Sequence, residues 1–236
     1  VLATGSVRLT SGGQIREMAG YSEGAWWVQD AASALPVRLL GDVQGKRVAD
    51  LCAAPGGKTA QLAASGARIT AVERSKKRLE RMEENLSRLG FNIETVCADA
   101  ATWRPDTPFD AILLDAPCTA TGSLRRHPDV ARLKSADDVT RLAAEQDHLI
   151  ANAAEMLSPG GTLVYCTCSL QKEEGEERIA HALKTIGSLE RSPIRAEEIG
   201  GLTEAITEKG EMRTLPCHLA DLGGLDGFFA ARLIKK

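Results

Sequence analysis

The stretch Asp50-Leu51-Cys52-Ala53-Ala54-Pro55-Gly56-Gly57-Lys58-Thr59 decides the fold that we expect. It follows a short apolar run that begins at Arg47, and it leads into a predicted helix from Thr59 onward. Its alanines and glycines let the backbone pass close to a bound molecule without a side chain in the way. The stretch therefore predicts a nucleotide-like cofactor site at the carboxyl end of a strand.

The glycine spacing in this loop excludes two common phosphate-binding loops. The dinucleotide fingerprint needs glycines spaced for a pyrophosphate, and the P-loop needs four residues between its first glycine and Gly-Lys. A cofactor without phosphate fits better. Glu73 ends the next predicted strand, about 20 residues further on, where an acidic side chain commonly binds a ribose hydroxyl. Together these features indicate an adenosine-containing cofactor.

Outward from this loop, short apolar runs alternate with amphipathic stretches from Lys46 to the end of the chain. This alternation predicts one α/β domain, with helices on both faces of a doubly wound, mostly parallel sheet. We expect residues 1–45 to form a lead-in that packs on the core domain 46–236. Strands are predicted at 47–52, 67–73, 93–99, 109–116, 161–169 and 227–234, and helices at 29–40, 75–89, 138–157 and 173–185, with Ser75 as an N-cap.

Four carboxylates stand near the carboxyl ends of four successive predicted strands. They are Asp50, Glu73, Asp99 and Asp115. A single carboxylate at such a place is more often a helix cap. Because the carboxyl ends of parallel strands share one edge of the sheet, the four together favour a cofactor cleft.

Two cysteines follow the fourth and fifth of these strands, so Cys118 and Cys168 leave the sheet at the same edge as the glycine loop. This pairing suits methylation of a cytosine. Carbon 5 of cytosine is too poor a nucleophile to take a methyl group unaided, whereas a thiolate that adds at carbon 6 creates an enamine at carbon 5. Such a reaction also needs a carboxylic group near ring nitrogen 3 and a base for the carbon 5 proton.

The remaining cysteines have a simpler interpretation as small hydrophobic residues of the core. This applies to Cys52, Cys97, Cys166 and Cys217. A metal site formed by Cys118, Cys166 and Cys168 is disfavoured, because no pair has the usual gap of two to four residues and no nearby His completes the ligands. We expect no metal.

Three motifs, in this order, resemble the RsmB/Sun and NSUN-type RNA 5-methylcytosine methyltransferases. They are the loop 50–59, Asp115-Ala116-Pro117-Cys118 with the following stretch 122–129, and Thr167-Cys168-Ser169. The likeness extends to residues 23–30 and 226–230. It implies a Rossmann-like methyltransferase catalytic domain with a seven-stranded sheet, S-adenosyl-L-methionine as cofactor, and RNA as substrate.

The resemblance also implies roles for individual residues. Cys168 is the nucleophile and Cys118 assists its release, whereas DNA cytosine methyltransferases use the cysteine of a Pro-Cys motif as nucleophile. Lys58 and Asp115 reach towards the target base. The implied cofactor site consists of Cys52, Ala53, Ala54, Pro55, Gly56, Gly57, Lys58, Glu73, Asp99 and Asp115.

Other residues near these motifs have two interpretations that the sequence weighs about equally. Arg125 and Arg126 could contact RNA phosphates or could be ordinary surface charges. Trp26 and Trp27 could stack on bases or could anchor the packing of the lead-in. His127 is expected to be structural.

Composition limits the partners. The net charge of −3 argues against binding RNA by bulk electrostatics alone, and bacterial members of the family carry an N-terminal RNA-binding region for which this chain has no room. Either further N-terminal sequence exists, or RNA recognition is reduced to the lead-in and the catalytic face, and the near-neutral charge favours further N-terminal sequence. No apolar run approaches the roughly 20 residues that span a bilayer, and we expect a cytoplasmic monomer with reduced thiols.

The predicted function is methylation of cytosine in small-subunit ribosomal RNA. The alternatives are a transfer RNA substrate, a cytosine in DNA, or a non-catalytic scaffold that binds RNA or cofactor. The intact set of Lys58, Asp115, Cys118 and Cys168 speaks against the scaffold.

Overall fold

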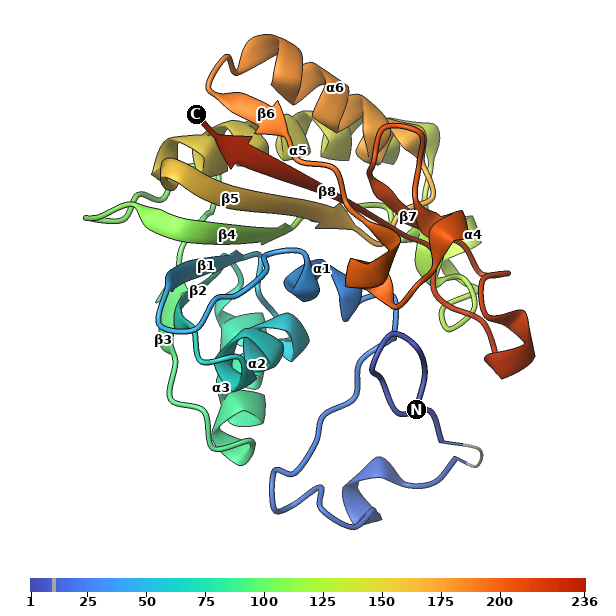
Figure 1. The fold of residues 1–236 in the computed structure, drawn as a ribbon. Coiled ribbons are helices and arrows are strands. Elements are labelled where there is room, and N and C mark those ends of the chain that lie inside the picture. The colour runs from blue at the N-terminus through green and yellow to red at the C-terminus, as the bar shows by residue number, and fades with distance from the viewer. Residues whose placement is uncertain (10–11) are drawn as a thin grey trace.

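An eight-stranded sheet forms the centre of the molecule (Figure 1). The structure, a computed structural model, describes residues 1–9 and 12–236. Its strands are β1 (Arg47–Leu51), β2 (Arg68–Glu73), β3 (Glu94–Cys97), β4 (Phe109–Asp115), β5 (Leu157–Thr167), β6 (Leu189–Arg191), β7 (Met212–Thr214) and β8 (Phe228–Lys235). Its helices are α1 (Leu35–Arg38), α2 (Gly57–Ala64), α3 (Lys76–Arg88), α4 (Val130–Leu133), α5 (Ala136–Met156) and α6 (Glu176–Thr185).

The strand order confirms the doubly wound, mostly parallel fold. The order is β3-β2-β1-β4-β5-β8-β6, and β7 pairs separately with β8. Strands β1 to β5 run parallel, while β8 runs antiparallel to β5, β6 and β7. Seven strands therefore lie along the main path, as the resemblance implies. The direction of winding reverses between β1 and β4, and ligands of such sheets bind at the carboxyl ends beside this switch point.

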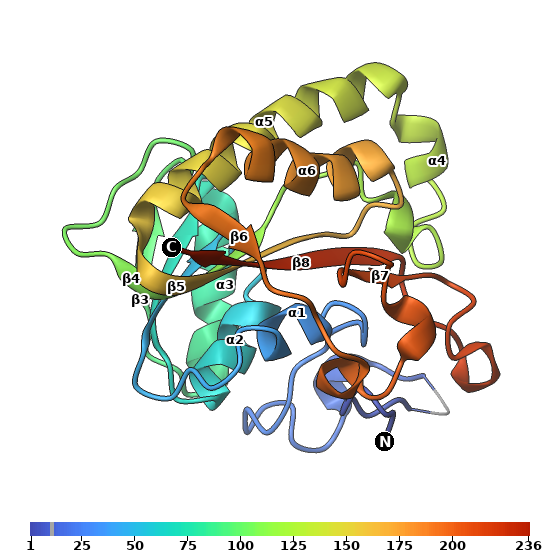
Figure 2. The same cartoon turned by 45° about the horizontal axis from the view of Figure 1, so that its top comes forward.

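Two hydrophobic layers enclose the sheet, one on each face. Helices α5 and α6 cover one face, and α1, α2 and α3 cover the other (Figure 2). Side chains of β4 alternate between the layers: Leu113 packs in the cluster with α2 and α3, while Ile112 and Leu114 pack in the cluster with α5 and α6. Burial on both faces explains why β4 reads as an almost continuous apolar run.

The three long predicted helices are present with small shifts at their ends. Ser75 caps α3 by accepting a hydrogen bond from the Arg78 N–H, and the apolar stripe Leu79, Met82 and Leu86 is buried. Helix α5 begins with a capping box at Ser135. No helix in the described part of the chain is both long and apolar enough to cross a membrane.

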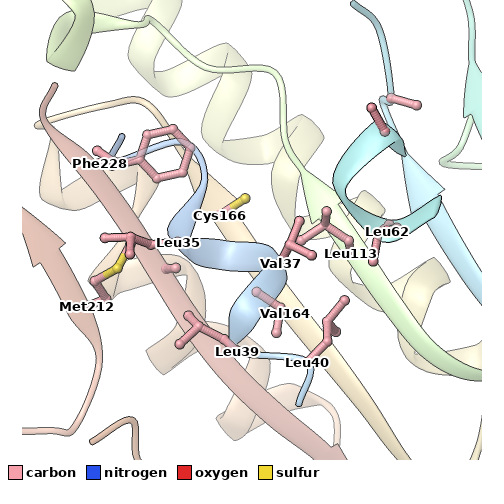
Figure 3. Close-up of a cluster of buried hydrophobic side chains, with 14 of the residues drawn as sticks. Leu35, Val37, Leu39, Leu40, Leu62, Leu113, Val164, Cys166, Met212 and Phe228 are labelled. Carbon is pink, nitrogen blue, oxygen red and sulfur yellow. The ribbon is translucent and has the colours of Figure 1, made fainter. Parts of the chain in front are cut away.

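The predicted helix 29–40 is wrong in its extent, because only α1 is helical there. Pro36 has no N–H to bond back to Ala32, so a helix cannot continue in register through the preceding turn. The Asp30 carboxylate instead accepts the Ala32 N–H at 2.9 Å and stabilises a turn. Helix α1 lies against the sheet (Figure 3). Side chains of α1 and of the two residues after it pack in one hydrophobic cluster with side chains of the strands. This cluster includes Leu35, Val37, Leu39, Leu40, Leu113, Val164, Cys166 and Phe228.

Candidate active site

The glycine loop runs from the end of β1 to the start of α2 and is pinned against α3. Gly56 has φ +96°, and a Cβ atom there would lie 2.6 Å from Cγ of Met82. Arg78 and Asn85 of α3 donate to the carbonyl oxygens of Ala54 and Pro55, at 2.6 and 3.3 Å. Only glycine combines this backbone conformation with this close approach.

Asp50 fastens the loop from inside the fold. It is fully buried, and its Oδ2 accepts the Thr59 hydroxyl at 2.6 Å. Its Oδ1 has no hydrogen-bond partner among the described residues. The pKa of Asp50 is raised from 3.8 to about 7, chiefly by burial; the Thr59 hydrogen bond acts in the opposite direction, and the nearby Asp115 carboxylate adds to the rise.

Glu73, Asp99 and Cys52 come together at the carboxyl ends of β2, β3 and β1, where they line a small cavity of about 30 Å³. One oxygen of Glu73, Oε1, accepts the Ser75 N–H at 2.9 Å. The other, Oε2, lies 3.3 Å from the Arg78 guanidinium but has no hydrogen-bond partner in the ranges described. The cavity thus presents a buried carboxylate oxygen with spare accepting capacity.

Most of the other residues predicted to form the cofactor site line a larger cavity of about 420 Å³. Ala53, Pro55, Gly56, Gly57, Lys58 and Asp115 all line it, whereas Ala54 lines neither cavity. The opposite wall comes from the lead-in, and of its wall residues the sequence had offered only Trp27, as a candidate for stacking on bases. Its contributing residues are Ile15, Tyr21, Trp27, Val28, Gln29, Asp30 and Ser33.

Lys58 and Asp115 form an ion pair at this cavity. The Lys58 ammonium donates to Asp115 Oδ2 at 2.7 Å and to the Ser33 hydroxyl at 2.9 Å, and it lies 5.0 Å from the centre of the Phe228 ring. Burial alone would lower the pKa of Lys58, but the adjacent Asp115 carboxylate outweighs it and raises the pKa above its ordinary value. Lys58 is therefore a fixed positive charge at neutral pH.

The two predicted cysteines meet. Cys118 follows β4 and Cys168 follows β5, and their sulfur atoms are 3.5 Å apart. Hydrogen bonding with Cys118 lowers the pKa of Cys168, and the Lys58 charge adds to this effect against burial and Asp115. The same hydrogen bond, together with burial, raises the pKa of Cys118. Of this thiol pair, Cys168 is the one that ionises first.

The remaining cysteines differ from one another. Cys166 is buried in the core, as predicted, and its thiol lies 3.6 Å from Asp115 Oδ1. The prediction of burial is wrong for Cys97 and Cys217, which are exposed because Cys97 lies on the edge strand β3 and Cys217 in the loop after β7. Cys52 is half-buried. Across residues 1–9 and 12–236, no group of three or more His, Cys, Asp or Glu side chains could hold a metal ion.

The two arginines after Cys118 have different surroundings. Arg125 bridges Asp30, at 3.1 Å, and Asp226, at 3.3 Å. Arg126 contacts only Asp226 of these two, at 2.6 Å, and also lines the large cavity with half of its side chain exposed. The next residue, His127, is exposed.

The two tryptophans also differ. Trp26 donates to the Ala19 carbonyl at 2.9 Å and packs edge-on against Tyr21, so it anchors the lead-in. Trp27 donates to the Gln29 side chain and lines the large cavity. The packing interpretation therefore fits Trp26, while Trp27 is placed where a base could reach it.

Comparison with known proteins places this geometry among RNA methyltransferases. A family model described as "16S rRNA methyltransferase RsmB/F" matches residues 37–234. "Ribosomal RNA small subunit methyltransferase B" of Pseudomonas putida is 43% identical over 227 residues, which cover 94% of this chain and 50% of that protein. The same-named protein of Erwinia tasmaniensis is 38% identical, with coverage of 98% and 52%. The chain thus spans about half the length of these curated relatives.

Two solved structures are also similar. NSun6 from Pyrococcus horikoshii with SFG has a TM-score of 0.79 and 31% identity, over 94% of this chain and 56% of that one. A methyltransferase homolog protein from the same organism has a TM-score of 0.77 and 32% identity, over 96% of this chain and 73% of that one.

Proposed function

Because the chain belongs to the RsmB/F family of 16S rRNA methyltransferases, we propose that it methylates carbon 5 of a cytosine in small-subunit ribosomal RNA. The observation that carries this proposal is the thiol pair, with sulfur atoms 3.5 Å apart at the sheet edge that also holds the Lys58–Asp115 ion pair. A nucleophilic thiol, a second thiol and a charged pair for the ring are the groups that this reaction requires.

The residues of the glycine loop fit S-adenosyl-L-methionine as the methyl donor. Glu73 Oε2 is a buried oxygen that lies 3.3 Å from the Arg78 guanidinium but has no hydrogen-bond partner in the described chain, so it can accept a further hydrogen bond. A ribose hydroxyl would satisfy it. Gly56 and Gly57 line the large cavity without a side chain, and Asp99, just after β3, lines the small cavity. When bound, this cofactor supplies an electrophilic methyl group.

The reaction begins with the Cys168 thiolate, which adds to carbon 6 of the cytosine and forms a C–S bond. The Lys58 ammonium, held by Asp115 at 2.7 Å, stabilises the negative charge that moves towards ring nitrogen 3. Carbon 5 thereby gains the electron density to accept the methyl group. Loss of the carbon 5 proton to a base then restores the ring double bond, and the C–S electron pair returns to sulfur. The Cys118 S–H is placed to hydrogen-bond this departing thiolate.

Trapping of the covalent protein–RNA adduct tests which cysteine attacks. We would incubate Cys118→Ala and Cys168→Ala with bacterial RNA and cofactor and separate the products on a denaturing gel. We expect a slow-migrating complex with Cys118→Ala, because release is impaired, and none with Cys168→Ala. The reverse pattern would make Cys118 the nucleophile, as in DNA cytosine methyltransferases.

Transfer of labelled methyl groups tests the substrate. Deproteinised small-subunit ribosomal RNA, transfer RNA and cytosine-containing DNA would be compared at the same salt concentration. We expect label in the ribosomal RNA. Label in transfer RNA alone would overturn the ribosomal assignment, and cofactor binding without any transfer would favour a scaffold.

A further inference from the structure

Glu174 touches the residue that follows each cysteine of the thiol pair. Thr119 follows Cys118, and its backbone N–H donates to Glu174 Oε1 at 2.9 Å while its hydroxyl donates to Oε2. Ser169 follows Cys168, and its hydroxyl donates to the same Oε2 at 2.6 Å. All three side chains are fully buried. One carboxylate therefore joins the two loops that carry the thiols.

The backbone of Glu174 is also held by hydrogen bonding. Its carbonyl accepts the buried Tyr165 hydroxyl at 2.7 Å. The Gln146 amide of α5 lies 3.3 Å from Glu174 Oε1 and also donates to the Pro117 carbonyl at 2.9 Å. The network thus ties both cysteine loops to β5 and α5, which are rigid parts of the fold.

Neutral groups surround the Glu174 carboxylate. Its hydrogen-bond donors are an amide N–H, two hydroxyls and the Gln146 side chain, all of them neutral. Burying a carboxylate among neutral groups costs more free energy than burying a neutral residue that joins the same elements. The hydrogen bond with Cys168 and burial are the main causes that raise the pKa of Cys118, and the negative charge of Glu174 adds to them.

We propose that Glu174 is the positioning residue of the thiol pair: by holding Thr119 and Ser169, it keeps the Cys118 S–H directed at the Cys168 sulfur. The inference deepens the proposed function, since it concerns the nucleophile of that same site. Glu174 does not contact the target base. It acts through the two loops, and its loss separates the thiols and removes the hydrogen bond that favours the Cys168 thiolate.

Site-resolved alkylation of the full chain tests this role without RNA or cofactor. Iodoacetamide modification of Cys168 and Cys118 would be followed by peptide mass spectrometry between pH 5 and 10. In the unmodified protein we expect Cys168 to react faster than Cys118. In Glu174→Ala we expect the Cys168 rate at pH 7 to fall about tenfold, as for a pKa rise of one unit, with its midpoint moved to higher pH.

Two further variants separate positioning from general damage. Glu174→Gln keeps the carbonyl acceptor and can donate to the two hydroxyls, so we expect Cys168 to react within about threefold of the unmodified protein. Glu173→Ala removes an exposed neighbouring carboxylate, and we expect no change. A folded Glu174→Ala protein with the original Cys168 rate and midpoint would overturn the inference, as would a Cys168 that reacts no faster than Cys118 before any substitution.

Ser169→Ala decides the question if Glu174→Ala loses its cooperative unfolding transition. It removes the hydrogen bond to Glu174 on the Cys168 side, together with the contacts of the Ser169 hydroxyl to Thr119, Thr121 and the Gln171 N–H, and leaves the Thr119–Glu174 link in place. We expect the Cys168 rate at pH 7 to fall about threefold. An unchanged rate would overturn the inference. Failure of the proposed function gives a different result: Cys168 would keep its Glu174-dependent reactivity, while no RNA would accept a methyl group.

Discussion

Asp50 is a carboxylic acid in a place where its ionisation is costly. Its folded-state pKa is about 7 against an ordinary value of 3.8, chiefly because of burial. A raised carboxyl pKa stabilises the fold below the unfolded-state value, and this contribution disappears as the pH rises through the folded-state value. Between pH 4 and pH 8, the free energy of unfolding therefore contains a term that falls by about 4 kcal/mol at most.

Asp50→Asn removes this term because its amide does not titrate. We expect the stability of the unmodified protein relative to Asp50→Asn to increase as the pH falls from 8 to 4, in urea unfolding experiments. In Thr59→Val, the pH dependence of the unfolding free energy should extend to higher pH, since the Thr59 hydroxyl lowers the Asp50 pKa. A constant difference between the unmodified protein and Asp50→Asn would show that Asp50 is ionised throughout.

Arg126 is the cationic residue after Cys118 that faces the large cavity. If it contacts an RNA phosphate, Arg126→Gln raises the KM for RNA several-fold with little change in kcat. The slope of log affinity against log salt concentration should fall by about 0.7, the value for one contact to single-stranded RNA. The exposed Arg132 of α4 does not line this cavity, so Arg132→Gln is the control. An unchanged salt slope for Arg126→Gln would show that Arg126 is an ordinary surface charge that does not contact an RNA phosphate.

At the residue scale, the sequence predicted the reactive side chains that lie near the carboxyl ends of the parallel strands. Cys118, Cys168, Asp115 and Lys58 were predicted and do come together, because parallel strands bring their carboxyl ends to one edge. The partners that orient them were not predicted. Ser33 reaches Lys58 from an irregular segment, and no local periodicity indicates such a contact.

At the scale of elements, the junction between the glycine loop and α3 depends on one close approach. Gly56→Ala would place a methyl group 2.6 Å from Met82 Cγ at a positive φ, and we expect a loss of roughly 2 to 4 kcal/mol in unfolding free energy. Gly41 also has a positive φ, but its Cβ position has no neighbour within 4 Å. Gly41→Ala therefore measures the conformational cost alone.

A double-mutant cycle isolates the steric part of this cost. We expect Gly56→Ala combined with Met82→Ala to lose at least about 1 kcal/mol less than the sum of the two single losses, because the shortened side chain makes room for the methyl group. Strict additivity would mean that Met82 moves aside at no cost and that the backbone conformation accounts for the whole effect.

Element prediction failed where local signals are short or tertiary contacts decide. Strands β6 and β7 have three residues each, too few for a period to be recognised, and both exist because β8 offers an edge for pairing. The predicted helix 29–40 is reduced to α1. The Asp30 turn precedes α1, and Pro36 near its start cannot donate a hydrogen bond to the residues before it. Long, strongly periodic segments such as α3 and α5 were predicted correctly because periodicity extends over several turns.

At the scale of the whole molecule, the lead-in and the sheet share the site. The sheet edge supplies the thiol pair and the ion pair, while the lead-in closes the large cavity from the other side. Three segments meet at one junction: Asp30 of the lead-in, Arg125 after β4, and Asp226 before β8. The position of the cavity wall therefore depends on contacts between residues about a hundred positions apart in the sequence.

Arg125→Gln tests this junction. Both carboxylate side chains are buried, and Arg125→Gln leaves Asp30 without this cation while Asp226 keeps its ion pair with Arg126. Because a third of the Arg125 side chain is exposed, solvent moderates the effect. We expect a loss of about 2 kcal/mol in unfolding free energy. Amide hydrogen exchange should accelerate across residues 21–34 but not in α5, because the lead-in loosens before the core opens.

The matched control is Arg141→Gln, which breaks an exposed pair with Asp138 on α5 and should cost well under about 1 kcal/mol. Exchange of the lead-in at the original rate in Arg125→Gln, despite a lower global stability, would show that Arg125 supports the β8 side alone. Faster exchange confined to the lead-in would instead predict a weaker Ser33–Lys58 contact, because Ser33 lies three residues from Asp30 and shares its segment. The position of the Lys58 ammonium would then depend on the junction as well as on the sheet.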